Sequence, residues 1–298
     1  MPLDTRSLID PVFFSRLESI ELRARSIVEG SMHGLHRSPY LGLSVEFASH
    51  REYAPGDDLR HLNWKLYARH DRLYIKEYDA DTNLNLYLLL DASASMSCAN
   101  SGRSKLHYAA SLAAALAHMA LKQRDAVGLT VYSDSVTAHL SPRAKPGQFD
   151  EVLATIASAE VRTATDNDRA LHQAAEFARR RGMVVLLSDL FGDLDTIVAG
   201  LDHLRFNNHE VIIWHIMDPY ERDLAVDGHI RFRDLESGET LTTQAEGVRD
   251  AYRRAVDDWR QALDLECRKR AIDRIELTTE DAPDRALLDY LVKRAKTF

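Results

Sequence analysis

The 298-residue chain has few of the features that mark secreted, membrane-spanning or metal-clustered proteins. Its two cysteines, Cys98 and Cys267, lie far apart and in no metal-binding spacing. Two thiols in a chain of this length fit a reducing cytoplasm better than a disulfide framework. The densest apolar run, residues 86–90, is as long as a strand, whereas a membrane helix needs roughly 18 apolar residues. Because the start also lacks the basic and apolar regions of a signal peptide, we expect a cytoplasmic protein without a membrane span.

A basic excess is absent too, because 38 Lys and Arg are outnumbered by 46 Asp and Glu, which gives a net charge of −8. Nucleic acids and anionic membranes are bound through basic stripes, so we expect neither as a partner. The one locally basic stretch, residues 51–76, is interrupted by acids, and solvated charges explain it more simply than a docking surface does. With 45% hydrophobic residues the chain can build a core, which excludes global disorder.

Sequence patterns divide the chain into residues 1–82 and residues 83–298. In the first part, apolar residues at helical spacing up to Gly30 predict an amphipathic helix: Phe13, Leu17, Ile20, Ala24 and Ile27. Short segments with Pro and Gly follow, including Pro55-Gly56-Asp57-Asp58, which is typical of a turn. A strand is predicted at residues 73–78.

In the second part, short apolar strands alternate with helices. Strands are predicted at residues 84–90, 127–132, 136–140, 183–187, 211–216 and 275–278. Helices are predicted at residues 108–123, 170–180, 194–204 and 249–269, with a last one opened by Pro283. A hairpin interrupts the order at about residues 228–243. This alternation predicts an α/β fold with a doubly wound, mostly parallel sheet.

Polar residues follow two of the predicted strands. Asp91 opens the run Asp-x-Ser-x-Ser with Ser93 and Ser95, and Asp189 ends a later strand. Between them Thr165 precedes a helix, with Thr163 as a rival. In an open α/β sheet ligands bind beyond the carboxyl ends of the strands, and Mg²⁺ prefers oxygen ligands. The five residues therefore predict a site for Mg²⁺ or Mn²⁺, although polar residues after a strand also serve as helix caps.

The Asp-x-Ser-x-Ser, Thr and Asp order resembles the metal-ion-dependent adhesion site of von Willebrand factor type A domains. The segments 46–48, 51–64 and 68–78 are similar to the signature of the bacterial domain-of-unknown-function family number fifty-eight. Members of that family are often encoded beside MoxR-type AAA+ ATPases. The resemblance implies a von Willebrand factor A-like fold, with Asp91, Ser93 and Ser95 as the first metal motif, Thr165 as the second and Asp189 as the third.

The sequence departs from the family pattern at two places. Asn63 stands where the resemblance implies aspartate, and Leu190-Phe191 follows Asp189 where it implies glycine. Neither departure involves a proposed metal ligand.

Three functions compete. The resemblance implies a non-enzymatic binding module whose metal accepts a carboxylate from a MoxR-type ATPase or its client. The chain has no phosphate loop, so ATP hydrolysis must come from elsewhere. The alternative is a Mg²⁺-dependent phosphatase of the haloacid-dehalogenase type with Asp91 as nucleophile. That class needs an acid/base aspartate where Ser93 stands, and the sequence indicates no lysine near the sheet edge. The third hypothesis is a purely structural interaction protein whose metal site is degenerate.

Overall fold

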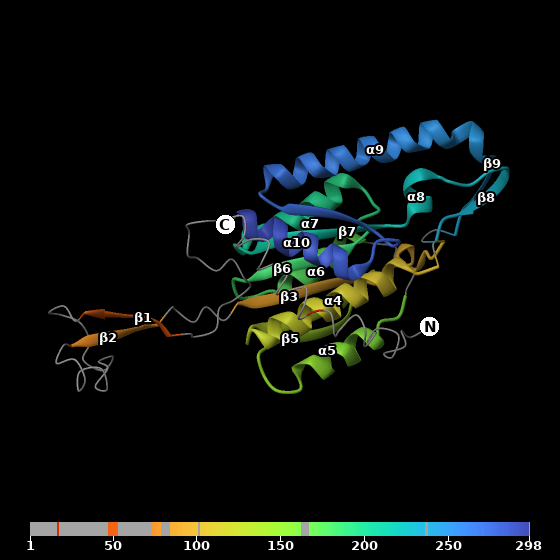
Figure 1. Ribbon diagram of the computed structural model, residues 1–298. Coiled ribbons are helices and arrows are strands. Elements are labelled where there is room, and N and C mark those ends of the chain that lie inside the picture. Colours follow the sequence, from red (N-terminus) through yellow and green to blue (C-terminus); the bar gives the residue numbers. More distant parts are fainter. Residues whose placement is uncertain are drawn as a thin grey trace.

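A computed structural model describes residues 17, 47–52, 73–78, 84–100, 102–161, 167–235 and 238–297. Its centre is a six-stranded sheet in the order β10-β7-β6-β3-β4-β5 (Figure 1). The strands are β3 (Asn85–Asp91), β4 (Ala126–Tyr132), β5 (Val136–Arg143), β6 (Met183–Ser188), β7 (Glu210–Met217) and β10 (Asp273–Thr278). Neighbouring strands are parallel except β5, which is antiparallel to β4. The predicted α/β fold with a mostly parallel sheet is confirmed.

Helices cover both faces of the sheet. On one face lie α4 (Lys105–Lys122), α5 (Gln148–Ala157) and α10 (Pro283–Thr297), and on the other lie α6 (Asn167–Phe177), α7 (Leu194–Phe206) and α9 (Ala245–Lys269). Alternate residues of β3 serve the two faces, so Leu88 packs with the first set and Leu89 with the second. A strand buried on both sides must be apolar throughout, as β3 and β6 are.

The strand order reverses at the middle of the sheet. From β3 the chain moves outward to β4 and β5, and then returns to place β6, β7 and β10 on the other side of β3. The reversal lies between β3 and β6, whose carboxyl ends are the usual ligand-binding position of such a sheet. The two strands that end in aspartate are therefore the two that flank this position.

Several element boundaries differ from the sequence-based predictions. Helix α4 begins three residues earlier than expected, because Ser104 caps it by accepting a hydrogen bond from the His107 backbone N–H. Helix α5 and the short helix α8 (Pro219–Asp223) were not predicted. The spacing of Tyr252, Val256, Trp259, Leu263 and Cys267 predicts a core stripe along α9. Only Leu263 and Cys267 of these are fully buried, because the first half of this long helix extends beyond the sheet (Figure 1).

The predicted hairpin is present as β8 (His229–Arg233) and β9 (Thr240–Gln244), which form a separate two-stranded sheet. Of the first part of the chain, Leu17 is helical and buried, and β1 (Phe47–Glu52) pairs antiparallel with β2 (Tyr74–Tyr78). The rest of the predicted unit 1–82, including most of its helix and the Pro-Gly-Asp-Asp turn, lies outside the described residues.

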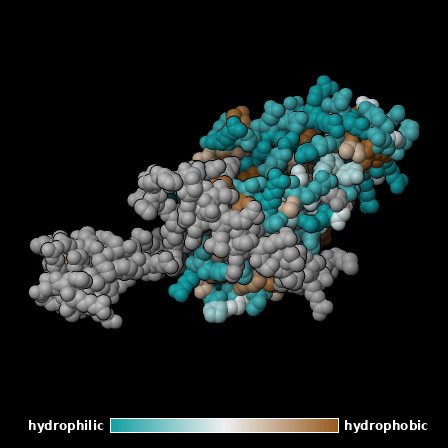
Figure 2. Space-filling view, viewed as in Figure 1, coloured by the Kyte–Doolittle hydropathy of each residue, from teal (hydrophilic) through white to brown (hydrophobic). Residues whose placement is uncertain are grey.

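The surface of the described part is mostly hydrophilic, with small scattered hydrophobic areas (Figure 2). Among the described residues, no helix combines the length and the hydropathy that crossing a membrane requires.

Gly182 gives the first prediction. It precedes β6, and a Cβ atom there would overlap the backbone carbonyl oxygen of Asn85 at the start of β3. We expect Gly182→Ala to lower the free energy of unfolding by about 1–3 kcal/mol, as overpacking does. Urea denaturation measures this. Gly192→Ala is the control, since its Cβ would meet only Ile197 Cδ1 at 3.9 Å. Equal losses in both variants would contradict the prediction.

Candidate functional site

The loop after β3 gathers the first three predicted site residues. Asp91 ends the strand, and its Oδ1 accepts a hydrogen bond from the Ser93 backbone N–H at 2.9 Å. The Oγ atoms of Ser93 and Ser95 lie 3.0 Å apart, and Ser95 opens the 3₁₀ helix η2 (Ser95–Ser97). Asp91 and Ser93 are buried. The sequence pattern therefore brings one carboxylate and two hydroxyl groups together, as predicted.

The end of β6 joins this loop. Ser188 donates a hydrogen bond from its Oγ to Asp91 Oδ2 at 2.5 Å, and the next residue is the buried Asp189. Asp189 Oδ1 accepts from the Phe191 backbone N–H at 3.2 Å. The second predicted motif, Thr165 with its rival Thr163, lies outside the described residues.

The two aspartates influence each other. Burial, followed by the negative charge of Asp189, raises the pKa of Asp91 to about 6. Hydrogen bonds from Ser188 and Ser93 lower that pKa but do not outweigh the two larger effects. The edge between β3 and β6 therefore concentrates negative charge out of contact with water, a condition that favours a cation.

A buried lysine stands beside Asp189, so the expectation of no lysine near the sheet edge was wrong. Lys105 is the first residue of α4, and its side chain is fully buried. Its Nζ lies 2.7 Å from Asp189 Oδ2 and 2.6 Å from Glu221 Oε2. Burial lowers the pKa of Lys105, but the two carboxylates outweigh it and raise that pKa. No local sequence pattern predicts this pair, because 84 residues separate Lys105 from Asp189.

Glu221 belongs to the unpredicted helix α8. Asp218 caps this helix, and the two side chains form a reciprocal capping box. The run Asp218-Pro219 with Glu221 three residues after the cap is a sequence signal for such a start, so the helix was detectable. Burial raises the pKa of Glu221, although Lys105 opposes the rise.

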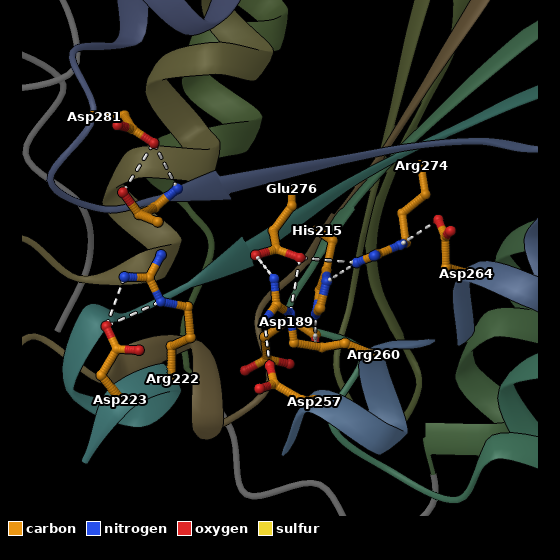
Figure 3. A network of polar contacts seen from close by, with 11 residues as sticks. Asp189, His215, Arg222, Asp223, Asp257, Arg260, Asp264, Arg274, Glu276 and Asp281 are labelled. Carbon is orange, nitrogen blue, oxygen red and sulfur yellow. Dashed lines mark hydrogen bonds and ion pairs between the residues drawn. The ribbon is translucent and has the colours of Figure 1, made fainter. Parts of the chain in front are cut away.

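A polar network supports Asp189 from the side of β7 and β10 (Figure 3). Arg274 donates from Nη1 to His215 Nδ1 at 2.8 Å, so Nδ1 is the acceptor nitrogen. The hydrogen therefore resides on Nε2, which lies 2.9 Å from the Asp189 carbonyl oxygen and donates to it. Burial first, and then the charge of Arg274, lower the pKa of His215 to about 4.

The network continues to the surface helix α9. Glu276 on β10 binds both Arg274 and Arg260, and these two arginines reach Asp264 and Asp257 on α9. Figure 3 shows Arg274 reaching His215, with Asp264 and Asp257 at the outer ends of the network. The backbone of Asp189 is thus held by a chain of paired charges that runs through three elements.

Leu190 stands directly after Asp189, where the family resemblance implies glycine. Its φ is +49°, in the left-handed region where glycine is unstrained. Its backbone N–H donates to Ser188 Oγ at 2.9 Å, and this holds the turn. The backbone therefore keeps a conformation suited to glycine although leucine stands there.

Other candidates have simpler roles. Asp193 caps α7 by accepting from the Thr196 backbone N–H at 3.1 Å. Cys98 and Cys267 are both free, and burial raises the pKa of the Cys98 thiol to about 12. Within the ranges that the structure describes, no three His, Cys, Asp or Glu side chains form a group arranged to hold a metal ion. The predicted ligand set differs from such a group because it contains serine and threonine hydroxyls.

The fold and this edge define a doubly wound α/β protein with a carboxylate and hydroxyl site at the reversal of its strand order. Residues 49–262 match the family model described as "Protein of unknown function DUF58", and the chain belongs to that family.

Relatives and solved structures are similar over most of the chain. Uncharacterised proteins of Mycobacterium tuberculosis and Mycobacterium bovis are 27% identical over 253 residues, which is 83% of this chain and 78% of theirs. An aerotolerance-related membrane protein of Bacteroides fragilis is similar at 17% identity and a TM-score of 0.48, over 72% of this chain and 100% of that one. BatB of Bacteroides thetaiotaomicron gives 17% identity and a TM-score of 0.44 over 72% and 99%.

The network predicts a shift in the titration of His215. In Arg274→Gln the pKa of His215 is expected to rise above about 4 but to stay below 6.5, because burial remains. The folded state favours the neutral form of His215, so the free energy of unfolding falls as the pH falls from 6.5 towards 4. Because the pKa shift is smaller in Arg274→Gln, this variant should lose less of that free energy. NMR titration of the imidazole measures this. Arg254→Gln on α9 changes the net charge equally and serves as the control; the same shift there would refute the role of Arg274.

Proposed function

We propose that this protein is a non-enzymatic, metal-dependent binding module of the von Willebrand factor A type. Asp91, Ser93 and Ser95 would hold Mg²⁺ or Mn²⁺ together with Thr165. Asp189 would contact the ion through a water molecule. A bound divalent cation supplies an electrophilic position that accepts a carboxylate oxygen from a partner. The observation that carries the proposal is the meeting of two buried carboxylates and two serine hydroxyls at the reversal of the strand order.

The charge balance at this edge supports a cation. Asp91, Asp189 and Glu221 contribute three carboxylates, and Lys105 contributes the single ammonium group that pairs with two of them. Asp91 is left without a cationic partner among the described residues, and its pKa is raised by burial and by the negative charge of Asp189. Buried charge without compensation is costly, and a divalent ion would remove the repulsion between the two aspartates.

The donor chemistry also fits a hard cation. Every side-chain atom offered by Asp91, Ser93 and Ser95 is an oxygen, which is the ligand type that Mg²⁺ and Mn²⁺ prefer. Asp189 is held by Lys105 on one oxygen and by a backbone N–H on the other, so it suits contact through water. A ligand set with one direct carboxylate leaves the ion enough positive charge to attract an external carboxylate.

The partner part of the proposal comes from the family resemblance. It names a MoxR-type AAA+ ATPase, or the client of that ATPase, in complex assembly or cofactor insertion. The absence of a phosphate loop from this chain agrees with a division of labour in which the partner hydrolyses ATP.

The structure places a lysine, Lys105, near the sheet edge, as the haloacid-dehalogenase alternative requires, but not the contacts and the acid/base aspartate of that site. Lys105 Nζ binds Asp189 and Glu221, and Asp91 is bound by Ser188 and Ser93 instead. The position two residues after Asp91 still carries a serine, which is a poor general acid. The binding module therefore remains the better reading.

Thermal unfolding tests the metal site. A ligand at about a hundred times its dissociation constant stabilises by about 2.7 kcal/mol, so wild type should gain about 5–10 °C in Mg²⁺ or Mn²⁺ over EDTA. Asp91→Asn should not respond. In EDTA, above the Asp91 pKa of about 6, the variant should be at least as stable as wild type, because a raised carboxyl pKa means that ionisation costs stability.

Asp125→Asn is the matched control for this test. Asp125 is buried at the opposite edge of the sheet, its Oδ1 accepts from the Leu84 N–H, and burial raises its pKa to about 6 as well. The variant should keep the full metal response. Equal responses of wild type and Asp91→Asn, or no response in either, would refute the metal site.

Binding to the ATPase is tested separately. Wild type should capture the MoxR-type ATPase in Mg²⁺, and EDTA or Asp91→Asn should weaken the capture at least about tenfold, since a metal-bound carboxylate contact is lost. Asp125→Asn should bind like wild type. Metal-independent capture that is equal in all three proteins would refute the proposed role of the site in partner binding.

A further inference from the structure

The hairpin β8–β9 stands apart from the central sheet. It interrupts the alternation of strands and helices, forms its own two-stranded sheet, and lies at the end of α9 that extends beyond the core (Figure 1). An isolated two-stranded ribbon adds little stability by itself. Its presence as an ordered insertion calls for a role outside the hydrophobic core.

One face of the hairpin is basic. In a strand alternate side chains share a face, and directly paired residues of antiparallel strands share it too. His229, Arg231 and Arg233 therefore lie on one face, opposite three exposed polar residues of β9: Gln244, Thr242 and Thr240. The three β8 residues are exposed, whereas Ile230 and Phe232 between them are half-buried.

The cations of this face have no counterions within the described part of the chain. Neither Arg231 nor Arg233 makes a side-chain ion pair or hydrogen bond there, and His229 makes none either. Other arginines nearby are paired, as Arg249 is with Asp227. In a chain with eight more acidic than basic residues, two arginines on one strand without an acidic partner among the described residues are unexpected. Their exposed side chains can accept an anion from a partner.

The base of the hairpin is fixed to the rest of the molecule. Gly228 donates its N–H to Glu246 Oε1 at 2.8 Å, and Arg249 donates to the backbone oxygens of Leu224 and Val226. The preceding helix α8 reaches the sheet edge through Glu221 and Lys105. The basic face is therefore carried on an anchored ribbon at the same end of the sheet as Asp91.

We propose that this face binds an acidic segment of a partner protein in an extended conformation. Side chains on one face of an extended segment repeat every second residue, about 7 Å apart, and Arg231 and Arg233 leave β8 at the same repeat. Carboxylates at alternate positions match it, and each can form a forked pair with an arginine. The inference stands apart from the proposed metal site, so the contact forms in EDTA as well.

The probe is a fluorescent peptide of about ten alternating Glu and Thr residues, followed by anisotropy at low salt. Wild type should bind it with and without EDTA. Arg231→Glu/Arg233→Glu should bind at least about tenfold more weakly, because attraction becomes repulsion at both sites. The milder Arg231→Gln/Arg233→Gln should weaken binding less, and it keeps the test valid if the first variant does not fold.

Arg180→Glu/Arg181→Glu is the matched control. These two arginines are exposed at the opposite edge of the sheet, and the change in net charge is identical. Binding within about twofold of wild type is expected there. Three results would overturn the proposal: no peptide binding by wild type, equal loss in both double variants, or tighter binding of a uridine-rich RNA oligomer that depends on Arg231 and Arg233.

Discussion

The pairing of Lys105 with two carboxylates is the interaction on which the functional edge depends. It joins the start of α4, the end of β6 and the helix α8, three elements that are distant in sequence. The ammonium group has no contact with water, and removing it would leave the two carboxylates without their cation. This constraint fixes Asp189 in place and explains why α8, a helix of five residues, keeps its position beside the sheet.

The same pairing gives the two aspartates different electrostatic surroundings. Lys105 pairs with Asp189 and Glu221, while Asp91 is held only by uncharged donors. Among the described residues Asp91 is therefore the carboxylate of this edge that has no cationic partner, and it lies beside the two serines. On the far side, the His215 and Arg274 network holds the Asp189 carbonyl in a fixed direction. Because buried pairs already set the charges around Asp91, the proposed cation would bind with little rearrangement of the site.

Sequence patterns predicted the fold well because each central strand is buried on both faces and therefore reads as an apolar run. They also placed Asp91 and Asp189 together, since both follow such runs in a parallel sheet. They did not find Lys105, because a lysine at a helix start looks like a surface residue until the tertiary structure buries it. Helix α5 was missed although Val152, Leu153 and Ile156 have helical spacing, and α8 although Asp218 and Glu221 form a capping signature. The apolar spacing along α9 predicted a stripe that only its second half buries, because spacing does not tell how far a helix extends past its sheet.

The two proposed binding surfaces differ in physical character and lie at the same end of the sheet. The proposed metal site binds one carboxylate in a defined direction, and its strength depends on the ion. The basic face of β8–β9 is proposed to attract carboxylates at long range before any forked pair forms, and this attraction falls as salt screens it. Helix α8 connects the two surfaces through Glu221 and the hairpin base. Arg231 and Arg233 could therefore orient a partner with an acidic extended segment before one of its carboxylates binds the proposed metal ion at Asp91. Salt would then act chiefly on the rate of association and the metal on the rate of dissociation, since long-range charge steers encounter whereas short-range coordination holds the complex.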